Sequence, residues 1–372
     1  MIFTAKPFCQ IKVYSLICGL YLLFMENPST SLQSLIDNFY DQVPQISSEK
    51  KYWLIRTNSG EYYDTFLANN YVAIGYNEIS LQAVNELKNA SPDHTDVVRN
   101  VKNLVIETYK ENEKRPGLVA NQILNFTYNI KKGDVVIIPS SSSNFVSFGE
   151  VEETPLMSLD YNRKDECDYY RRKKIKWIKQ LRRNELEPLL FRMFFSHNAV
   201  NDVSIYGDLI ESTFSNYFIK DEQEHIVLNI QQNENIGALD LFQLGFYLLN
   251  SVGDFIKANE LNTLNVGEFD VKVNLNSKGK LKFISKFGKG GMILAIIAVA
   301  INGGGGEIGV ANYFSLNLST NGIIQKVIDY QNESHNREMT EKIINSMDSL
   351  MVETPDDVVQ LLKEFSNKTK PK

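Results

Sequence analysis

The stretch that decides the fold begins with KYWLIRTNSGEYYDTFLANNYVAIGYNEI (Lys51–Ile79) and ends with NIKKGDVVIIPSSSSNFVSFGEVEE (Asn129–Glu153). β-Branched and aromatic residues gather there in four short runs, which we predict to be two pairs of strands: Tyr52–Arg56 with Tyr71–Tyr76, and Asp134–Pro139 with Asn144–Val151. Turn residues separate these runs, above all Gly60, Gly133 and the serine run Ser140–Ser143. Strands on either side of a helical segment, with aromatics beside turn glycines, predict a small β-barrel that presents a pocket.

The sequence around these runs has helical periodicity. Apolar residues at helical spacing predict helices at Leu32–Phe39, at Leu81–Tyr109 (in two parts, interrupted at Ser91–Asp93) and at Leu118–Ile130. Gly133 follows the last of them, as a C-terminal cap would. The stretch YYRRKKIKWIKQLRR (Tyr169–Arg183) alternates basic and apolar residues, and we predict that it is a strand that ends this module.

The remainder of the chain mixes helices and strands. The predicted helices lie at Glu185–Phe195, Asp202–Tyr217, Ala238–Val252, about Gly322–Met351 and from Thr354 onward. The predicted strands lie at His225–Ile230, Asn265–Val273, Lys280–Phe287 and Tyr313–Leu318, the second and third as an antiparallel pair. The chain is therefore expected to be α+β, with a leader at 1–30, the barrel module at 31–183, a mixed α/β region at 184–330 and C-terminal helices at 331–372.

The composition limits the classes of function. Hydrophobic residues make up 43% and charged residues 23% of the 372, as in globular proteins. The net charge of −6 means that any contact with nucleic acid must come from a local basic patch. Three cysteines and four histidines, none at metal-ligand spacing, predict neither a disulfide framework nor a metal site, and they suit a reducing cytoplasm. We expect no cofactor and assign no catalytic residue.

The amino terminus carries an apolar run, Val13–Met25, preceded by Lys6 and Lys12. It is long enough for a signal-peptide core but shorter than the roughly 20 residues that span a bilayer. No small-x-small cleavage site follows it. We therefore favour a mis-assigned start, with Met25 as the first residue, or a dispensable extension.

Four stretches of the barrel segment resemble a known group of modules: WLIR (Trp53–Arg56), VAIGY (Val72–Tyr76), VANQILNF (Val119–Phe126) and GDVVIIPS (Gly133–Ser140). They recur in this order in the PUA-like modules, of the EVE and YTH type, at the N-terminus of Mrr-type restriction proteins. The resemblance covers a little over a third of the chain. It implies a PUA-like barrel that recognises nucleic acid, with a modified base or a nucleotide signal as its ligand, in a bacterial defence or restriction system.

PUA-like domains that bind modified bases hold a flipped base between aromatic side chains and a few polar groups. Stacking on an aromatic side chain contributes about 1–3 kcal/mol per base. The residues that we expect in such a pocket are Trp53, Arg56, Tyr76, Asn121 and Phe145. For Trp53 and Phe145 the alternative is a position in the core.

The stretch Tyr169–Arg183 is the most basic of the chain. Lysine and arginine contacts to phosphates give salt-dependent affinity that does not depend on base sequence. The residues that we expect to contact a nucleic-acid backbone are Arg171, Arg172, Lys173, Lys174, Lys176, Trp177 and Lys179. The alternative is a solvated edge strand that its lysines protect from aggregation.

The resemblance to Mrr-type proteins raises the question of a nuclease in the second half. Such a domain needs an acidic residue and a D/E-x-K pair that hold Mg²⁺ and activate water. The nearest match is Asp270-Val271-Lys272, with Glu268 beside it and Asp240 as a weak upstream partner. We therefore expect a protein without catalytic activity and keep a divergent Mg²⁺-dependent restriction nuclease as an alternative.

The run GGMILAIIAVAINGGGG (Gly290–Gly306) contains no charged residue over 17 positions. Its apolar core, Met292–Ile301, is too short to span a bilayer. No Gly-Lys-Ser/Thr follows the glycines, which excludes a phosphate-binding loop of that type. Three interpretations stay open: a buried helix that ends in a glycine turn, a segment that inserts on activation, or a weak membrane span.

The sequence thus predicts a protein that recognises nucleic acid or a nucleotide and passes the response to its C-terminal half. We expect it in the cytoplasm, with contact to a membrane through residues 290–306 as an open alternative. The main alternative is a membrane-acting defence effector that uses residues 290–306. The identity of the ligand, the choice between DNA and RNA, and the oligomeric state are left open.

Overall fold

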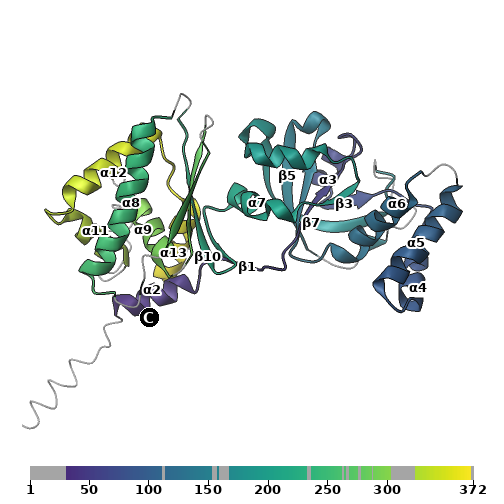
Figure 1. The fold of residues 1–372 in the computed structure, drawn as a ribbon, viewed down its shortest axis with the longest axis horizontal. Helices are drawn as coiled ribbons and strands as arrows, with labels where there is room; N and C mark the ends of the chain where they lie inside the picture. Colours follow the sequence, from purple (N-terminus) through teal and green to yellow (C-terminus); the bar gives the residue numbers. More distant parts are fainter. Residues whose placement is uncertain are drawn as a thin grey trace, which may run out of the picture. The chain divides into compact units, whose positions relative to one another are not determined.

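A computed structural model describes residues 31–110, 114–152, 157–158, 167–232, 236–261, 264, 268–274, 278–286, 288–302 and 323–369. The chain forms two compact units (Figure 1). The strand-rich unit comprises Pro44–Ile236 and Phe269–Lys286, and the helical unit comprises Met1–Val43, Gly237–Glu268 and Phe287–Lys372. The α+β class predicted from the sequence is confirmed.

The larger sheet of the strand-rich unit forms a half-barrel. Its strands run in the order β3-β7-β5-β4-β2-β8, with β6 beside β7. Their bounds are β2 Tyr52–Ile55, β3 Tyr71–Ile74, β4 Val135–Pro139, β5 Phe145–Val151, β6 Met157–Ser158, β7 Arg171–Arg182 and β8 Val200–Asp202. Every residue of β2, β3 and β4 is buried, because these strands carry apolar side chains on both faces.

All four strands predicted in the opening stretch are present, but their pairing differs in part from the expectation. β4 and β5 form the predicted second pair, and it is antiparallel. β2 and β3 do not pair with each other: β2 lies parallel to β4 and antiparallel to β8, and β3 pairs with β7. A pattern of short apolar runs indicates strands but not their neighbours.

The strand-rich unit contains the helices α3 Tyr63–Ala68, α4 Leu81–Ala90, α5 His94–Tyr109 and α6 Pro116–Leu124, of which the last three begin at local sequence signals. Ser80 and Asp93 cap α4 and α5 by accepting hydrogen bonds from main-chain N–H groups, and α6 begins with a proline. A π-helical turn, Asn125–Asn129, extends α6 toward Gly133, whose φ of +87° suits the turn predicted there.

A second sheet in the same unit has the order β1-β9-β10-β12-β11. Its strands are β1 Gln45–Ile46, β9 Tyr217–Lys220, β10 Gln223–Asn229, β11 Phe269–Asn274 and β12 Lys280–Ser285. The predicted antiparallel pair is confirmed as β11 and β12, and the predicted strand at residues 225–230 as β10.

The connection between the two sheets differs from the prediction. The expected helix at Glu185–Phe195 is 3₁₀, in two turns at Arg183–Glu185 and Pro188–Phe195. The expected helix at Asp202–Tyr217 is reduced to α7, Gly207–Phe214, after a 3₁₀ turn at Ser204–Tyr206. β8 and β9 occupy the ends of that predicted helix, because tertiary pairing overrides local periodicity.

The helical unit contains α2 Leu32–Tyr40, α8 Ala238–Ala258, α9 Gly290–Asn302, α11 Ile323–Asn332, α12 Arg337–Leu350 and α13 Asp356–Thr369. The single helix predicted over 322–351 is two helices, α11 and α12. Asn336, which is 5% exposed, donates a hydrogen bond to the main-chain oxygen of Tyr330 at 2.9 Å and so caps the end of α11.

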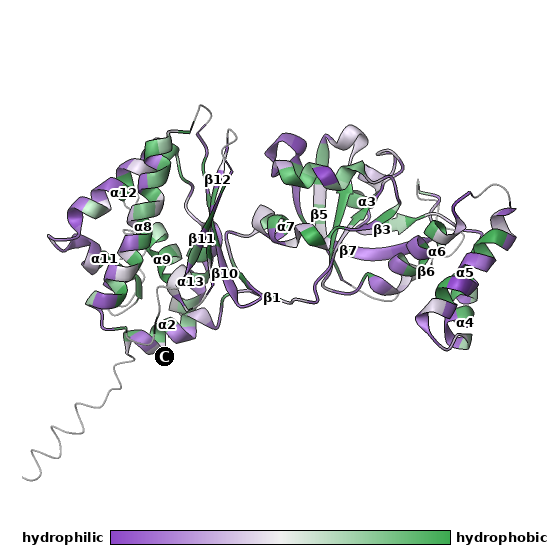
Figure 2. Cartoon of the chain, viewed as in Figure 1, coloured by the Kyte–Doolittle hydropathy of each residue, from purple (hydrophilic) through white to green (hydrophobic). Residues whose placement is uncertain are grey.

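α9 is the centre of the helical unit. It packs against α8, α11, α12 and α13, and every residue from Gly290 to Ile301 is buried (Figure 1). Figure 2 shows this helix as hydrophobic, as expected for a helix with other helices on several sides. Of the three interpretations of this segment, the buried helix is therefore the one that the structure supports.

No helix among the described residues is both long and apolar enough to cross a membrane. The predicted strand at Tyr313–Leu318, the glycine turn at Gly303–Gly306 and the apolar run Val13–Met25 lie outside the described residues.

Candidate anion-binding groove

A groove of about 490 Å³ opens in the strand-rich unit where the end of β7 meets the β11–β12 hairpin. The connection after β7 supplies Arg183 and Phe191, and the hairpin supplies Asn274, Lys278 and Lys280. Two segments about 90 positions apart in sequence thus line one groove, and three of these five side chains are cationic.

Arg183 lies over the face of Phe191, with its guanidinium carbon 5.1 Å from the ring centroid. Such cation–π contact keeps the guanidinium beside an apolar surface while its N–H groups stay able to bind an anion. The main-chain N–H of Arg183 donates to the oxygen of Asn144 at 2.9 Å, which fixes this end of β7 to the start of β5. The groove therefore has a positioned arginine on an aromatic platform.

Two glutamates also line the groove, but both make other contacts. Glu185 accepts a hydrogen bond from the main-chain N–H of Arg182 at 2.7 Å, and Glu187 accepts one from the Asn274 amide at 2.6 Å. Neither forms an ion pair with the groove's cations within the described part of the chain. The positive charge of the groove is thus not cancelled by direct ion pairs.

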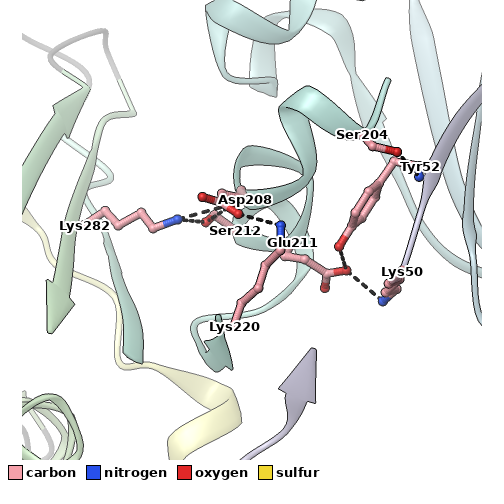
Figure 3. Close-up of polar contacts among 8 residues, drawn as sticks. All are labelled: Lys50, Tyr52, Ser204, Asp208, Glu211, Ser212, Lys220 and Lys282. Carbon is pink, nitrogen blue, oxygen red and sulfur yellow. Dashed lines mark hydrogen bonds and ion pairs between the residues drawn. The ribbon is translucent and has the colours of Figure 1, made fainter. Parts of the chain in front are cut away.

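Three lysines from two sheets converge on the last turns of α7. Lys280 donates to the main-chain oxygen of Ser212 at 2.8 Å and Lys179 to that of Thr213 at 3.0 Å. Lys282 donates to the Ser212 hydroxyl at 2.7 Å (Figure 3). Carbonyl oxygens at a helix C-terminus carry partial negative charge and suit cations, but they do not neutralise them as carboxylates would.

The proximity of these lysines changes their protonation. Burial, with repulsion from Lys179, lowers the pKa of Lys280 to about 8, against an opposing attraction from Glu187. Burial also lowers the pKa of Lys282 to about 8, with repulsion from Lys272, Lys280 and Lys220 as further causes. An anion bound beside Lys280 would offset this repulsion and favour its charged form.

Residues Asp208 and Glu211 of α7 join this lysine cluster to the half-barrel. Glu211 accepts hydrogen bonds from the Tyr52 hydroxyl at 2.6 Å and from Lys50 at 2.7 Å, and Asp208 pairs with Lys220 at 2.8 Å (Figure 3). Burial and the Glu211 carboxylate raise the pKa of Tyr52, which keeps its hydroxyl a donor. α7 is therefore held by charged contacts to strands of both sheets.

The pocket residues predicted from the sequence are not all available to a ligand. Trp53 is 1% exposed, packs in the core and donates from its indole N–H to Asp134 at 2.9 Å. In this structure it therefore occupies the core position that was the alternative. Arg56 donates to the main-chain oxygens of Phe194 and Ser196, so its guanidinium fixes the 3₁₀ segment.

The other three predicted pocket residues lie apart. Tyr76 follows β3 and is partly buried. Its main-chain oxygen accepts a hydrogen bond at 2.7 Å from the side chain of Arg171, the first residue of β7. Asn121 is exposed on α6. Phe145 is 40% exposed and lies opposite Arg182, at the other end of β7. The five side chains therefore do not form one cage, and Phe145 is the one beside the end of β7 that leads to the groove.

The predicted basic strand exists as β7, and its first residues lie between two neighbouring strands. It pairs with β3 and β6 through its first residues and with β5 through the rest. Figure 2 shows much of it as hydrophilic. Among the described residues, Arg171 and Arg172 have a strand on each side, whereas residues 176–182 pair with β5 alone, so the edge-strand alternative stays open for that part of β7.

The predicted phosphate contacts on β7 divide into two groups. Arg171, Arg172 and Lys173 are buried, and the two arginines donate to main-chain oxygens. These three side chains are therefore not exposed to a nucleic-acid backbone in this structure. Lys174, Lys176 and Lys179 are exposed, while Trp177 is half-buried and packs over Gly149, where a Cβ atom would lie 2.7 Å from the indole.

Sequence reasoning missed Arg183, Phe191, Lys278 and Lys280. The only local signal was the spacing of lysines in KGKLK (Lys278–Lys282), which is common on exposed hairpins. Nothing in the sequence indicates that this hairpin lies beside the end of β7.

The residues of the nuclease alternative are divided between the two units. Asp270 pairs with Lys286 at 3.0 Å, whereas Asp240 belongs to α8 of the helical unit and accepts a hydrogen bond from Ser349. Within the described residues no group of three or more histidine, cysteine, aspartate or glutamate side chains is placed to hold a metal ion.

Comparison with known proteins adds one match. Residues 51–204 match a family described as a domain of unknown function (DUF8426). The curated proteins and the solved structures contain no match to the chain. The matched segment extends past the predicted module boundary at residue 183 and includes β8, the strand that pairs with β2. The segment similar to this family thus runs from β2 to just before α7.

Proposed function

We propose that the strand-rich unit binds nucleic acid through its phosphates, with the groove at Arg183 and Lys280 as the contact region. The observation that carries this proposal is the way the cations are held. Lys179 and Lys280 bond to helix carbonyl oxygens, and Arg183 lies on an aromatic ring. Cations held without carboxylate partners keep their charge available for phosphate oxygens.

Aromatic surfaces near the groove favour a ligand that carries bases as well as phosphates. Phe191 lines the groove beneath Arg183, and Phe145 is exposed opposite Arg182. Single-stranded nucleic acid is bound by such a combination of cations along the backbone and aromatic rings under the bases. We therefore propose a single strand as the ligand, contacted without sequence-specific hydrogen bonds at this groove.

The resemblance of residues 51–150 to the PUA-like modules of Mrr-type proteins supports the same ligand class. It also motivates a role in bacterial defence, in which nucleic-acid binding by the strand-rich unit triggers a response of the helical unit. We propose recognition without catalysis; Asp270, the aspartate of the nuclease alternative, is paired with Lys286. The burial of α9 between helices leaves the membrane-acting alternative without structural support.

Fluorescence anisotropy with labelled oligothymidylate and oligouridylate tests this proposal and separates DNA from RNA. A labelled nucleoside triphosphate serves as the third probe and separates a strand from a free nucleotide. Arg183→Ala is expected to weaken binding about tenfold, because it removes both a phosphate contact and the cation over Phe191. Lys102→Ala, an exposed lysine of α5, is the matched control and should bind as the unmodified chain does. Equal affinity of both variants would contradict the proposal.

A further inference from the structure

β11 is the outermost strand of the second sheet. Among the residues that the structure describes, its ladder partner is β12 alone. Four of its six residues are exposed, including Val271 at 44% and Val273 at 41%. A strand of this kind presents a row of main-chain N–H and C=O groups that another strand can pair with.

The apolar face of the sheet continues to this open edge. Val271 lies opposite Phe283 and Val273 opposite Leu281 in the β11–β12 ladder, and both partners on β12 are buried. The two exposed valines thus extend a buried apolar surface by one strand. A further strand beside them would remove them from water.

The other face of β11 carries charged side chains, and one of them, Lys272, faces a like charge. Lys272 lies directly opposite Lys282, and like charges opposite each other destabilise a ladder. The structure gives Lys272 no ion pair within the described residues, and its charge is one cause of the lowered pKa of the buried Lys282. Two positions away on the same face, Asp270 is half-exposed and pairs with Lys286.

We propose that β11 pairs antiparallel with β11 of a second copy of this chain, centred on Val271. In this register Asp270 lies opposite the partner's Lys272, and by symmetry the same pair forms a second time. Val273 lies opposite the partner's Phe269, and the two Val271 side chains meet at the axis. The strand FDVKVN is therefore complementary to itself in charge and in hydrophobicity.

The charges also select the register. A pairing centred on Lys272 would place Lys272 opposite the partner's Lys272 and would add to the repulsion from Lys282. A pairing centred on Asp270 would place two aspartates together. Within the six residues of β11, the centre at Val271 is the one that gives each Lys272 a carboxylate.

Charge reversal with mixing tests the proposal in the full chain. The unmodified protein should sediment as a concentration-dependent dimer of its 42.5 kDa chain. Asp270→Lys and Lys272→Asp should each weaken dimerisation by about tenfold or more, because each replaces two attractive pairs with two repulsive ones. A mixture of the two variants should recover the dimer, because one edge then carries only lysines and the other only aspartates.

Circular dichroism of each variant shows whether it is folded. Dimer formation in the mixture shows that β11 of each variant can still pair with a complementary strand. Recovery in the mixture cannot come from misfolded chains. A monomer at all concentrations, as expected if another segment of the same chain covers β11, would overturn the proposal. So would a dimer that neither substitution weakens.

Discussion

The ammonium group of Lys280 lies 2.8 Å from the main-chain oxygen of Ser212, in the last turns of α7, and the same side chain lines the groove beside Arg183. One hydrogen bond thus places a groove cation on the helix that also holds Tyr52 of the half-barrel through Glu211. The charge state of this lysine is central to what the groove can bind.

Affinity for nucleic acid is expected to fall as pH rises through about 8. Burial lowers the pKa of free Lys280 to about 8, so the groove loses positive charge above that pH. Anisotropy titrations at constant ionic strength, with the oligothymidylate probe, measure this dependence. Lys280→Arg should flatten the profile between pH 7 and about 9, because arginine stays charged throughout. If affinity depends on pH in the same way in this variant as in the unmodified chain, the titrating group is not Lys280.

Substitutions of Trp53 and Phe145 are expected to separate stability from binding. Trp53→Ala removes a buried ring and a hydrogen bond to Asp134, so it should lower the free energy of unfolding by about 3–5 kcal/mol. Phe145→Ala, at a half-exposed position, should change stability little and weaken binding by about 1–3 kcal/mol if a base stacks there. Urea unfolding and anisotropy measure the two quantities. A stable Trp53→Ala variant with lost binding would restore this residue to the ligand site.

Lys173 is expected to destabilise the folded chain at neutral pH. It is fully buried, its ammonium group has no hydrogen-bond partner among the described residues, and burial lowers its pKa to about 8. The folded state therefore binds fewer protons than the unfolded state between about pH 8 and pH 10.4, and this group makes stability rise with pH across that window. Lys173→Met should raise the free energy of unfolding at pH 7 by on the order of 1–3 kcal/mol and remove part of the rise. Urea titrations at both ends of the window test this, and a destabilised variant would contradict it.

Tyr52 and Glu211 are expected to be coupled in stability. Tyr52→Phe removes the hydrogen bond to a buried carboxylate, and Glu211→Gln removes the ion pair with Lys50; each should cost about 1–3 kcal/mol. The double variant should cost less than the sum, because both changes act on one carboxylate. Additive losses in a double-mutant cycle would mean that α7 is not held through this contact.

Much of the fold follows from local patterns, as particular elements show. The short runs of β-branched and aromatic residues that begin near Tyr52, Tyr71 and Val135 predicted strands that the structure contains, and the cap residues Ser80 and Asp93 begin helices where the spacing indicated. These features depend on residues within a few positions of one another. The pairing of β2 with β8 and of β3 with β7 depends on contacts more than 90 positions apart, which one sequence does not reveal.

The candidate site was less predictable for the same reason. The basic composition of β7 was visible, but burial divides it: Arg171 and Lys173 face the interior, and Lys179 faces α7. Arg183 was the last residue of the predicted strand and carried no signal of its own. Arg183 belongs to the candidate site because it lies over the ring of Phe191 and because a hairpin about 90 positions later completes the groove beside it.

The salt dependence of binding by an Arg183→Ala, Lys278→Ala double variant tests the central claim most directly. Each lysine or arginine that contacts a phosphate of a single strand contributes about 0.7 to the slope of log affinity against log salt concentration. The double variant should therefore bind oligothymidylate more weakly and with a slope reduced by about 1.4, whereas Lys102→Ala should keep both affinity and slope. A double variant whose affinity and slope match those of the unmodified chain would contradict phosphate binding in this groove.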